Sequence, residues 1–190
     1  MNLDQCHLEL IERVPAIVIV VPENSLLYGP ACQIREMVLA YESDGLRFES
    51  GGDDVNALAS YAYALGWLDA GCCIGLIQSY EPKRGWFLPE SSSDNTVDER
   101  LIEKTGRYHK LLGMACEAVE PVPDEGSLLL DGSERILMVG RTFLLFGEAA
   151  LKKQRSRVAL LCFSYGFGWL DAGIRAGLLA ARKYRDIFTI

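Results

Sequence analysis

The stretch Gly66-Trp67-Leu68-Asp69-Ala70-Gly71 decides how this chain is organised, because it recurs letter for letter as Gly168-Trp169-Leu170-Asp171-Ala172-Gly173. The two copies lie 102 residues apart, and the same offset pairs Tyr63 with Tyr165. A chance match of six letters would not bring this register with it. We therefore infer an internal duplication, which makes the repeat the starting point for the fold.

The duplication divides the 190 residues into two similar units, 1–90 and 91–190. Each is near the length expected of a small single domain. The segment Glu81 to Ser93 is rich in Pro, Gly and Ser, a composition that predicts an exposed linker. Charge also differs across it, with a net −9 up to Asn95 and +2 from Thr96 onward. The units are therefore expected to attract each other, within one chain or between chains.

The composition is that of a soluble globular protein, with 49% hydrophobic residues and a net charge of −7. This acidity argues against binding to nucleic acid or to an anionic membrane. The amino terminus has no basic stretch followed by an apolar core, so we expect no secretion signal. Six cysteines without a regular framework suit the reducing cytosol, and we expect a cytoplasmic location.

The pattern of caps, breaks and apolar residues predicts an all-α fold with three helices in each unit. In the second unit the predicted helices run from the Thr96/Glu99 capping box to Glu120, from Ser127 or Ser133 to Lys153, and from Ser156 to Ala181. In the first unit we expect a second helix over 25–49, a break at Gly51-Gly52, and a third helix capped by Asp53 or Asp54. The β-branched run over 16–21 predicts a short strand or extended segment.

The third helix of each unit is nearly uncharged. Ala57 to Ile77 carries only Asp69, and the second copy carries only Asp171 and Arg175. This length would suffice to cross a bilayer, but an Asp in mid-helix costs about 2.5–3.5 kcal/mol on insertion. We therefore predict a buried central helix and no membrane span.

Small residues recur at spacings of four on these helices, as in Gly66 with Ala70 and Gly71 with Gly75. Such a stripe favours close approach of another helix, because each interior glycine otherwise costs up to ~1 kcal/mol. The alternative is that the bare backbone forms the floor of a ligand groove.

Asp69 and Asp171 are the most informative residues, since a buried carboxylate needs a partner. One interpretation is structural: a hydrogen bond to an indole or tyrosine, or an ion pair with Arg35, Arg47 or Arg141. The other is a ligand site or an acid and base pair in a cavity between the units. The candidate ligand-binding residues are then Asp69, Asp171, Tyr63, Tyr165, Trp67 and Trp169.

Catalytic and metal motifs are missing from the sequence. His7 and His109 stand in no ligand pattern, and we expect no metal and no cofactor. The basic cluster Lys152 to Arg157 lacks interleaved aromatic residues, so a solvated turn is favoured over a nucleic-acid site.

The segments Tyr41 to Phe48, Gly52 to Leu58 and Gly66 to Gly71 resemble an archaeal helical family, domain of unknown function 357, and the second copy resembles it as well. The resemblance implies that each unit is a three-helix up-and-down bundle, in a cytoplasmic archaeal protein. It implies no activity. Phe146 and Lys153-Gln154 depart from the family pattern, so we expect no shared role at those positions.

Two functions follow as hypotheses. The first is a cytosolic helical-bundle interaction or scaffold module without catalytic activity, which self-associates or binds a protein partner. The second is a small-ligand binder or enzyme with its pocket between the units around Asp69 and Asp171. The sequence leaves open whether the protein is an enzyme.

Overall fold

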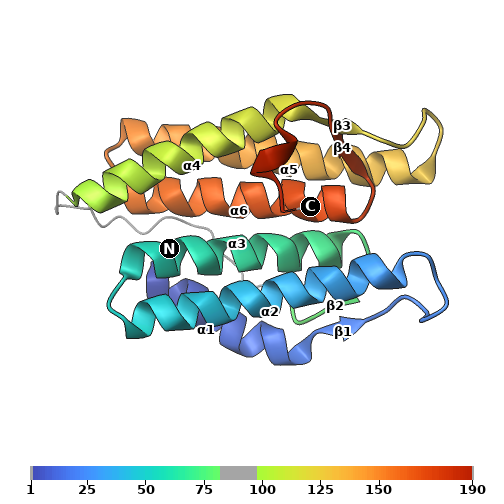
Figure 1. Ribbon diagram of the computed structural model, residues 1–190, viewed down its shortest axis with the longest axis horizontal. Helices are drawn as coiled ribbons and strands as arrows, with labels where there is room; N and C mark the ends of the chain where they lie inside the picture. Colours follow the sequence, from blue (N-terminus) through green and yellow to red (C-terminus); the bar gives the residue numbers. More distant parts are fainter. Residues whose placement is uncertain (1, 82–97, 190) are drawn as a thin grey trace.

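The computed structural model describes residues 2–81 and 98–189, and within them the protein consists of two three-helix halves (Figure 1). The first half contains α1 (Leu3–Arg13), α2 (Tyr28–Ser50) and α3 (Asp54–Cys73). The second contains α4 (Glu99–Ala118), α5 (Leu128–Lys152) and α6 (Ser156–Arg175). The predicted all-α class is confirmed. The predicted linker falls almost entirely outside the described residues, as does Thr96 of the predicted capping box.

Short polar side chains begin most of the helices. Asp53 accepts a hydrogen bond from the Asn56 N–H and caps α3, as the sequence predicted. Ser127 caps α5 in the same way. Asp98 caps α4 by accepting from the N–H groups of Arg100 and Leu101, a cap that the sequence analysis did not predict.

Each half is closed by a pair of very short antiparallel strands. In the first half β1 (Val18–Ile19) pairs with β2 (Ile77–Gln78), and a 3₁₀ turn, η1 (Val14–Ala16), precedes β1. In the second half β3 (Val119–Pro121) pairs with β4 (Leu179–Ala181), and a last turn, η2 (Arg185–Ile187), follows. The extended segment predicted over 16–21 is confirmed.

The pairing of the strands corrects three predicted helix ends. α4 ends at Ala118 and not at Glu120, while α3 and α6 end at Cys73 and Arg175 and not at Ile77 and Ala181. For α3 and α6 the reason lies in Gly75 and Gly177, which have φ of +71° and +74° and end these two helices in left-handed turns. After these turns the apolar residues continue as strand and not as helix.

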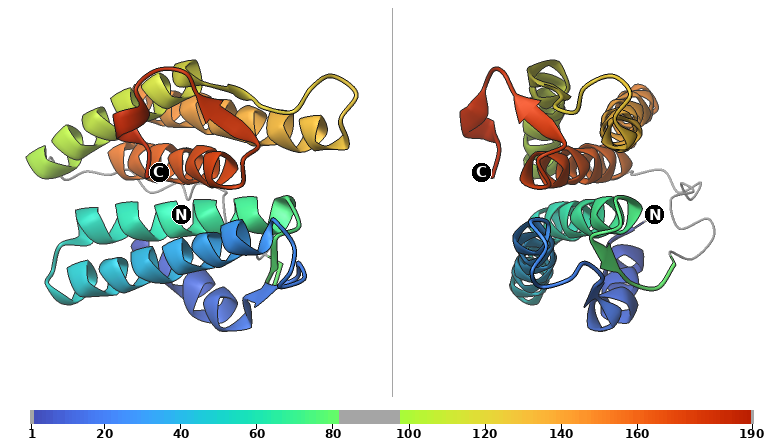
Figure 2. Two further views of the ribbon diagram at one scale, coloured as in Figure 1. Left: turned by 45° about the vertical axis from the view of Figure 1, so that its right-hand side comes forward. Right: turned by 90° about the vertical axis from the view of Figure 1, so that its right-hand side faces the viewer.

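The two central helices, α3 and α6, lie side by side at the boundary between the halves and run in the same direction (Figures 1 and 2). α2 packs on α3, and α5 packs on α6, so each central helix is covered on several sides. Almost every residue from Val55 to Gly71, and from Ala159 to Gly173, is buried. The prediction of a central buried helix in each unit is confirmed. Among the described residues, no helix combines the length and apolarity that a membrane crossing requires.

The repeated glycines fall into three structural roles. Gly66 and Gly168 lie against each other where α3 and α6 cross, with each ideal Cβ position 3.2 Å from the other's Cα. Gly71 and Gly173 instead contact Ile34 and Ile136 within their own halves. Close helix approach therefore accounts for the first four of these glycines, whereas Gly75 and its counterpart Gly177 belong to the turns.

Candidate functional site

The predicted site residues come together at the boundary between the halves in a reciprocal arrangement. Tyr165 on α6 donates a hydrogen bond of 2.6 Å to Oδ2 of Asp69 on α3. Tyr63 on α3 donates a hydrogen bond to Oδ2 of Asp171 on α6. Each tyrosine therefore binds the aspartate of the opposite half, and the two contacts are related by the 102-residue offset. This is the self-complementary pattern of an approximate twofold axis.

Asp69 has a second partner from its own half. The guanidinium of Arg13, at the end of α1, forms an ion pair with Oδ1 of Asp69. Arg13 is held in place because its Nε donates to the Tyr80 carbonyl at 3.0 Å, while its own carbonyl accepts from the Ser79 hydroxyl at 2.6 Å. The side chains of Arg13 and Asp69 are only 3% and 12% exposed. Both carboxylate oxygens of Asp69 are thus occupied by donors of the protein.

Asp171 is satisfied differently, by the carboxyl-terminal segment. Thr189 donates to it through its hydroxyl, at 2.9 Å, and through its backbone N–H, at 3.4 Å. Arg175, which follows Asp171 by one helical turn, donates to the Thr189 carbonyl and to the Gln33 side chain. Asp171 is 2% exposed. The position equivalent to Arg13 in the second half is Ala115, so the two halves satisfy the repeated aspartate by different means.

Burial shifts the protonation of all four groups. It raises the pKa of Asp171 to about 6, although hydrogen bonds from Tyr63 and Thr189 act in the opposite direction. Burial also raises the pKa of Asp69, with the Arg13 charge and the Tyr165 hydrogen bond opposing it. The pKa values of Tyr63 and Tyr165 lie well above their usual range, first because of burial and then because of the neighbouring aspartates. Both tyrosines are therefore neutral hydrogen-bond donors.

Trp67 and Trp169 lie one turn beyond the tyrosines. Each indole ring centroid is 6.2 Å from the ring of Tyr63 or Tyr165 in its own helix. Both indoles are buried, so they pack the helix boundary and do not line a surface. Among the partners that the sequence analysis suggested for the two aspartates, only tyrosine forms the hydrogen bonds that the structure describes. The ion pair expected with an arginine of the second helices is replaced by one with Arg13 of α1, and this is a correction.

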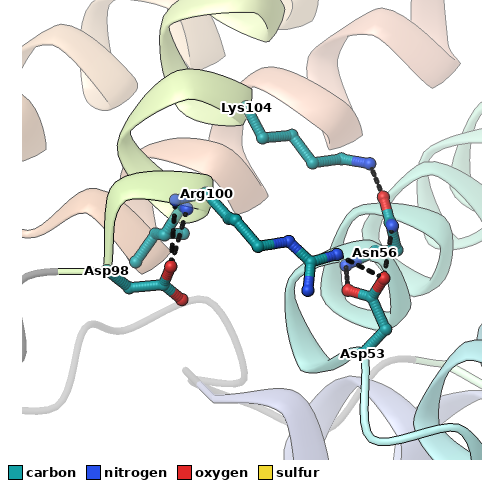
Figure 3. Close-up of polar contacts among 6 residues, drawn as sticks. Asp53, Asn56, Asp98, Arg100 and Lys104 are labelled. Atoms are coloured by element: carbon teal, nitrogen blue, oxygen red, sulfur yellow. Dashed lines mark hydrogen bonds and ion pairs between the residues drawn. The ribbon is translucent and has the colours of Figure 1, made fainter.

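A second polar cluster bridges the halves at the amino-terminal ends of α3 and α4 (Figure 3). Arg100 forms an ion pair of 2.7 Å with Asp53, and Lys104 donates a hydrogen bond to the Asn56 side chain. Burial would raise the pKa of Asp53, but hydrogen bonds from Asn56 and Arg100 together lower it. Burial lowers the pKa of Lys104. The sequence analysis did not predict this bridge, because none of these residues is repeated.

The two histidines occupy equivalent places, each stacked on an aromatic ring of its central helix. His7 lies 5.0 Å from the ring of Tyr61, and His109 lies 4.9 Å from the ring of Phe163. Each is also 3.0 Å from a glutamate, Glu49 or Glu148. The two histidines are 102 residues apart in the sequence, and this offset was the signal that could have pointed to their equivalent contacts.

Within residues 2–81 and 98–189, no group of three or more His, Cys, Asp or Glu side chains is arranged to hold a metal ion. The repeated site offers two carboxylates, two phenols and one guanidinium, all hydrogen-bonded to one another or to Thr189. Chemically, such a set fixes two helices against each other. Acid and base chemistry would require a substrate to displace these donors.

A family model described as a protein of unknown function (DUF357) matches residues 8–77 and 107–179. The chain belongs to this family. No curated protein and no solved structure matches it. In this DUF357 protein each matched segment contains one Tyr and one Asp of the reciprocal pairs, together with one glycine of the helix crossing. Arg13 lies within the first match, whereas Thr189 lies beyond the second.

Proposed function

We propose that the protein is a non-catalytic interaction or scaffold module, in which two helical halves are locked together to present their outer helices to a partner. The observation that supports this most directly is the occupancy of the Asp69 and Asp171 oxygens. All four accept hydrogen bonds or an ion pair from side chains or backbone of the chain itself. Because the oxygens of both repeated aspartates already bind groups of the chain itself, we infer that these carboxylates hold the two halves together.

The helix crossing supports the same proposal. Glycines at the contact of α3 and α6 let the backbones approach closely, and the surrounding tyrosine, tryptophan and phenylalanine side chains fill the remaining space. Rigid positioning of outer helices is what a scaffold requires. A cytoplasmic location is part of the proposal and rests on the composition of the chain.

The alternative, a small-ligand binder or enzyme with its site between the halves, is favoured by one observation. A carboxyl group with a pKa of about 6 is suited to proton transfer near neutral pH. For this function Asp171 would have to exchange Tyr63 or Thr189 for a ligand.

A metabolite thermal-shift screen separates the two functions. The interaction module predicts that no compound raises the midpoint of unfolding in a manner that depends on Tyr63 and Tyr165. The screen is therefore run on the wild type and on the Tyr63→Phe/Tyr165→Phe protein in parallel. A compound that stabilises only the wild type would contradict the proposal and support the ligand site. Capture of partners from an extract of the native cells, analysed by mass spectrometry, then identifies what the module binds.

A further inference from the structure

The outward face of α5 has an apolar surface groove of about 480 Å³. Its lining is Pro121, Glu134, Leu137, Met138, Arg141, Thr142 and Leu145. Met138 and Leu145 are 60% and 63% exposed although both are large and apolar. They lie seven residues apart, which is two helical turns, and therefore share one face of the helix.

The duplication provides an internal control for this face. At the equivalent positions of α2 in the first half, Met138 is replaced by Glu36 and Leu145 by Ser43, and both are exposed there. Polar residues therefore occupy the equivalent exposed positions of the first half. Folding does not require Met138 or Leu145 to be apolar, so the apolar face needs another explanation, and exposed apolar grooves with a polar rim are typical of binding surfaces.

The charges on the rim indicate what covers the groove. Glu134 and Arg141 lie two turns apart on the groove side of α5. The ion pairs found among the described residues include neither of them. If a second α5 packs antiparallel about a point between Leu137 and Met138, Glu134 of each copy lies opposite Arg141 of the other. The same register places Leu145 opposite Leu130 and brings the exposed Met138 of each copy close to the rotation axis, beside Leu137, which is only 6% exposed. One rotation therefore satisfies both charges twice and covers the apolar residues, as a twofold interface requires.

We propose that the occupant of this groove is a second copy of the chain, giving a homodimer through antiparallel packing of the α5 helices. This inference rests on the proposed function, since it names the first partner of the interaction module. Met138 suits such a contact, because its unbranched side chain adapts to the surface that it meets.

The test is sedimentation velocity or light scattering after size exclusion, over a range of protein concentrations. The wild type is expected to approach twice the chain mass of 21.1 kDa as concentration rises. The Met138→Glu/Leu145→Ser variant, which takes the residues of the first half, is expected to stay monomeric. The control is Leu46→Ser on α2, which removes another exposed leucine and should leave the dimer intact. Far-ultraviolet circular dichroism verifies that each variant is folded.

The register has its own test. Glu134→Arg and Arg141→Glu should each weaken dimerisation at least ten-fold, and the double charge swap should restore most of it. A wild type that stays monomeric, or one that forms larger open assemblies, overturns the dimer. A charge swap that fails to restore the dimer overturns the antiparallel register. These outcomes are independent of the thermal-shift screen, which alone decides between an interaction module and a ligand site.

Discussion

Gly66 lies directly against Gly168, and this contact fixes how closely the two halves approach. A Cβ built on Gly168 would lie 2.6 Å from the Tyr63 carbonyl oxygen and 3.2 Å from the Gly66 Cα. A side-chain rotamer change could not relieve this contact, because the neighbouring atoms belong to the backbone. The short distance between α3 and α6 therefore requires glycine at both positions. The same short distance lets each tyrosine reach the aspartate of the opposite half.

We expect Gly168→Ala to destabilise the protein by about 1–3 kcal/mol, because the added methyl group forces the central helices apart. Gly106→Ala is the matched control. Gly106 lies inside α4 with nothing within 4 Å of its Cβ position, so alanine there should stabilise by roughly 0.5–1 kcal/mol. Urea unfolding followed by circular dichroism measures both. Equal effects of the two substitutions would show that the crossing tolerates a side chain.

Tyr63→Phe and Tyr165→Phe should each cost about 1–3 kcal/mol, because each leaves a buried carboxylate oxygen with one donor fewer. Tyr80→Phe is the control, since this side chain is 67% exposed and only its backbone carbonyl takes part in the site. Chemical denaturation again provides the free energy of unfolding. If all three substitutions cost the same small amount, the hydroxyl groups do not hold the boundary.

Arg13→Met should destabilise the protein by about 3 kcal/mol, because it leaves the nearly buried Asp69 carboxylate without its cationic partner. Adding Asp69→Asn should recover most of this loss, since the amide oxygen still accepts from Tyr165 and no charge remains. A double variant as unstable as Arg13→Met alone would mean that Arg13 acts through packing of its side chain and not through its charge.

The raised pKa of Asp171 predicts that the stability of the protein depends on pH in a specific way. Its pKa rises on folding from 3.8 to about 6, so the native state holds the proton more tightly than the unfolded chain does. The resulting stabilisation is complete below about pH 4 and is lost as pH rises through about 6. Relative to Asp171→Asn, the wild type should lose on the order of 3 kcal/mol across this window and then level off. A difference between the two proteins that does not vary with pH would contradict this assignment.

The repeat predicted more of the fold than the local pattern did. The exact recurrence of Gly66 to Gly71 established two units with similar central helices, and the Asp53 cap was readable beside the Gly51-Gly52 break. The carboxyl ends of α3 and α6 were misplaced because Gly75 and Gly177 were interpreted as part of a helical stripe. A glycine shortly before a short apolar run is also the usual signal for a left-handed helix end.

The sequence singled out Asp69 and Asp171 as buried carboxylates that need partners, but it did not predict how those partners are arranged. Asp69 and Asp171 stood out because a carboxylate in an apolar helix must be satisfied, and tyrosine was among the partners considered. That each tyrosine binds across the boundary depends on how α3 and α6 pack, which spacing along one helix cannot specify. Arg13 and Thr189 lie 56 and 18 residues from the aspartates that they bind, and neither has an identical residue at the 102-residue offset.

A double-mutant cycle between Tyr63 and Asp171, repeated for Tyr165 and Asp69, tests the central claim most directly. Its variants are Tyr→Phe, Asp→Asn and their combination, and a cycle of Tyr63→Phe with Glu120→Gln, whose carboxylate pairs with Arg182, is the control. We predict coupling energies of about 1–3 kcal/mol in both cross-boundary cycles and additive effects in the control. Coupling below ~0.5 kcal/mol in both would contradict the claim that these pairs lock the two halves together.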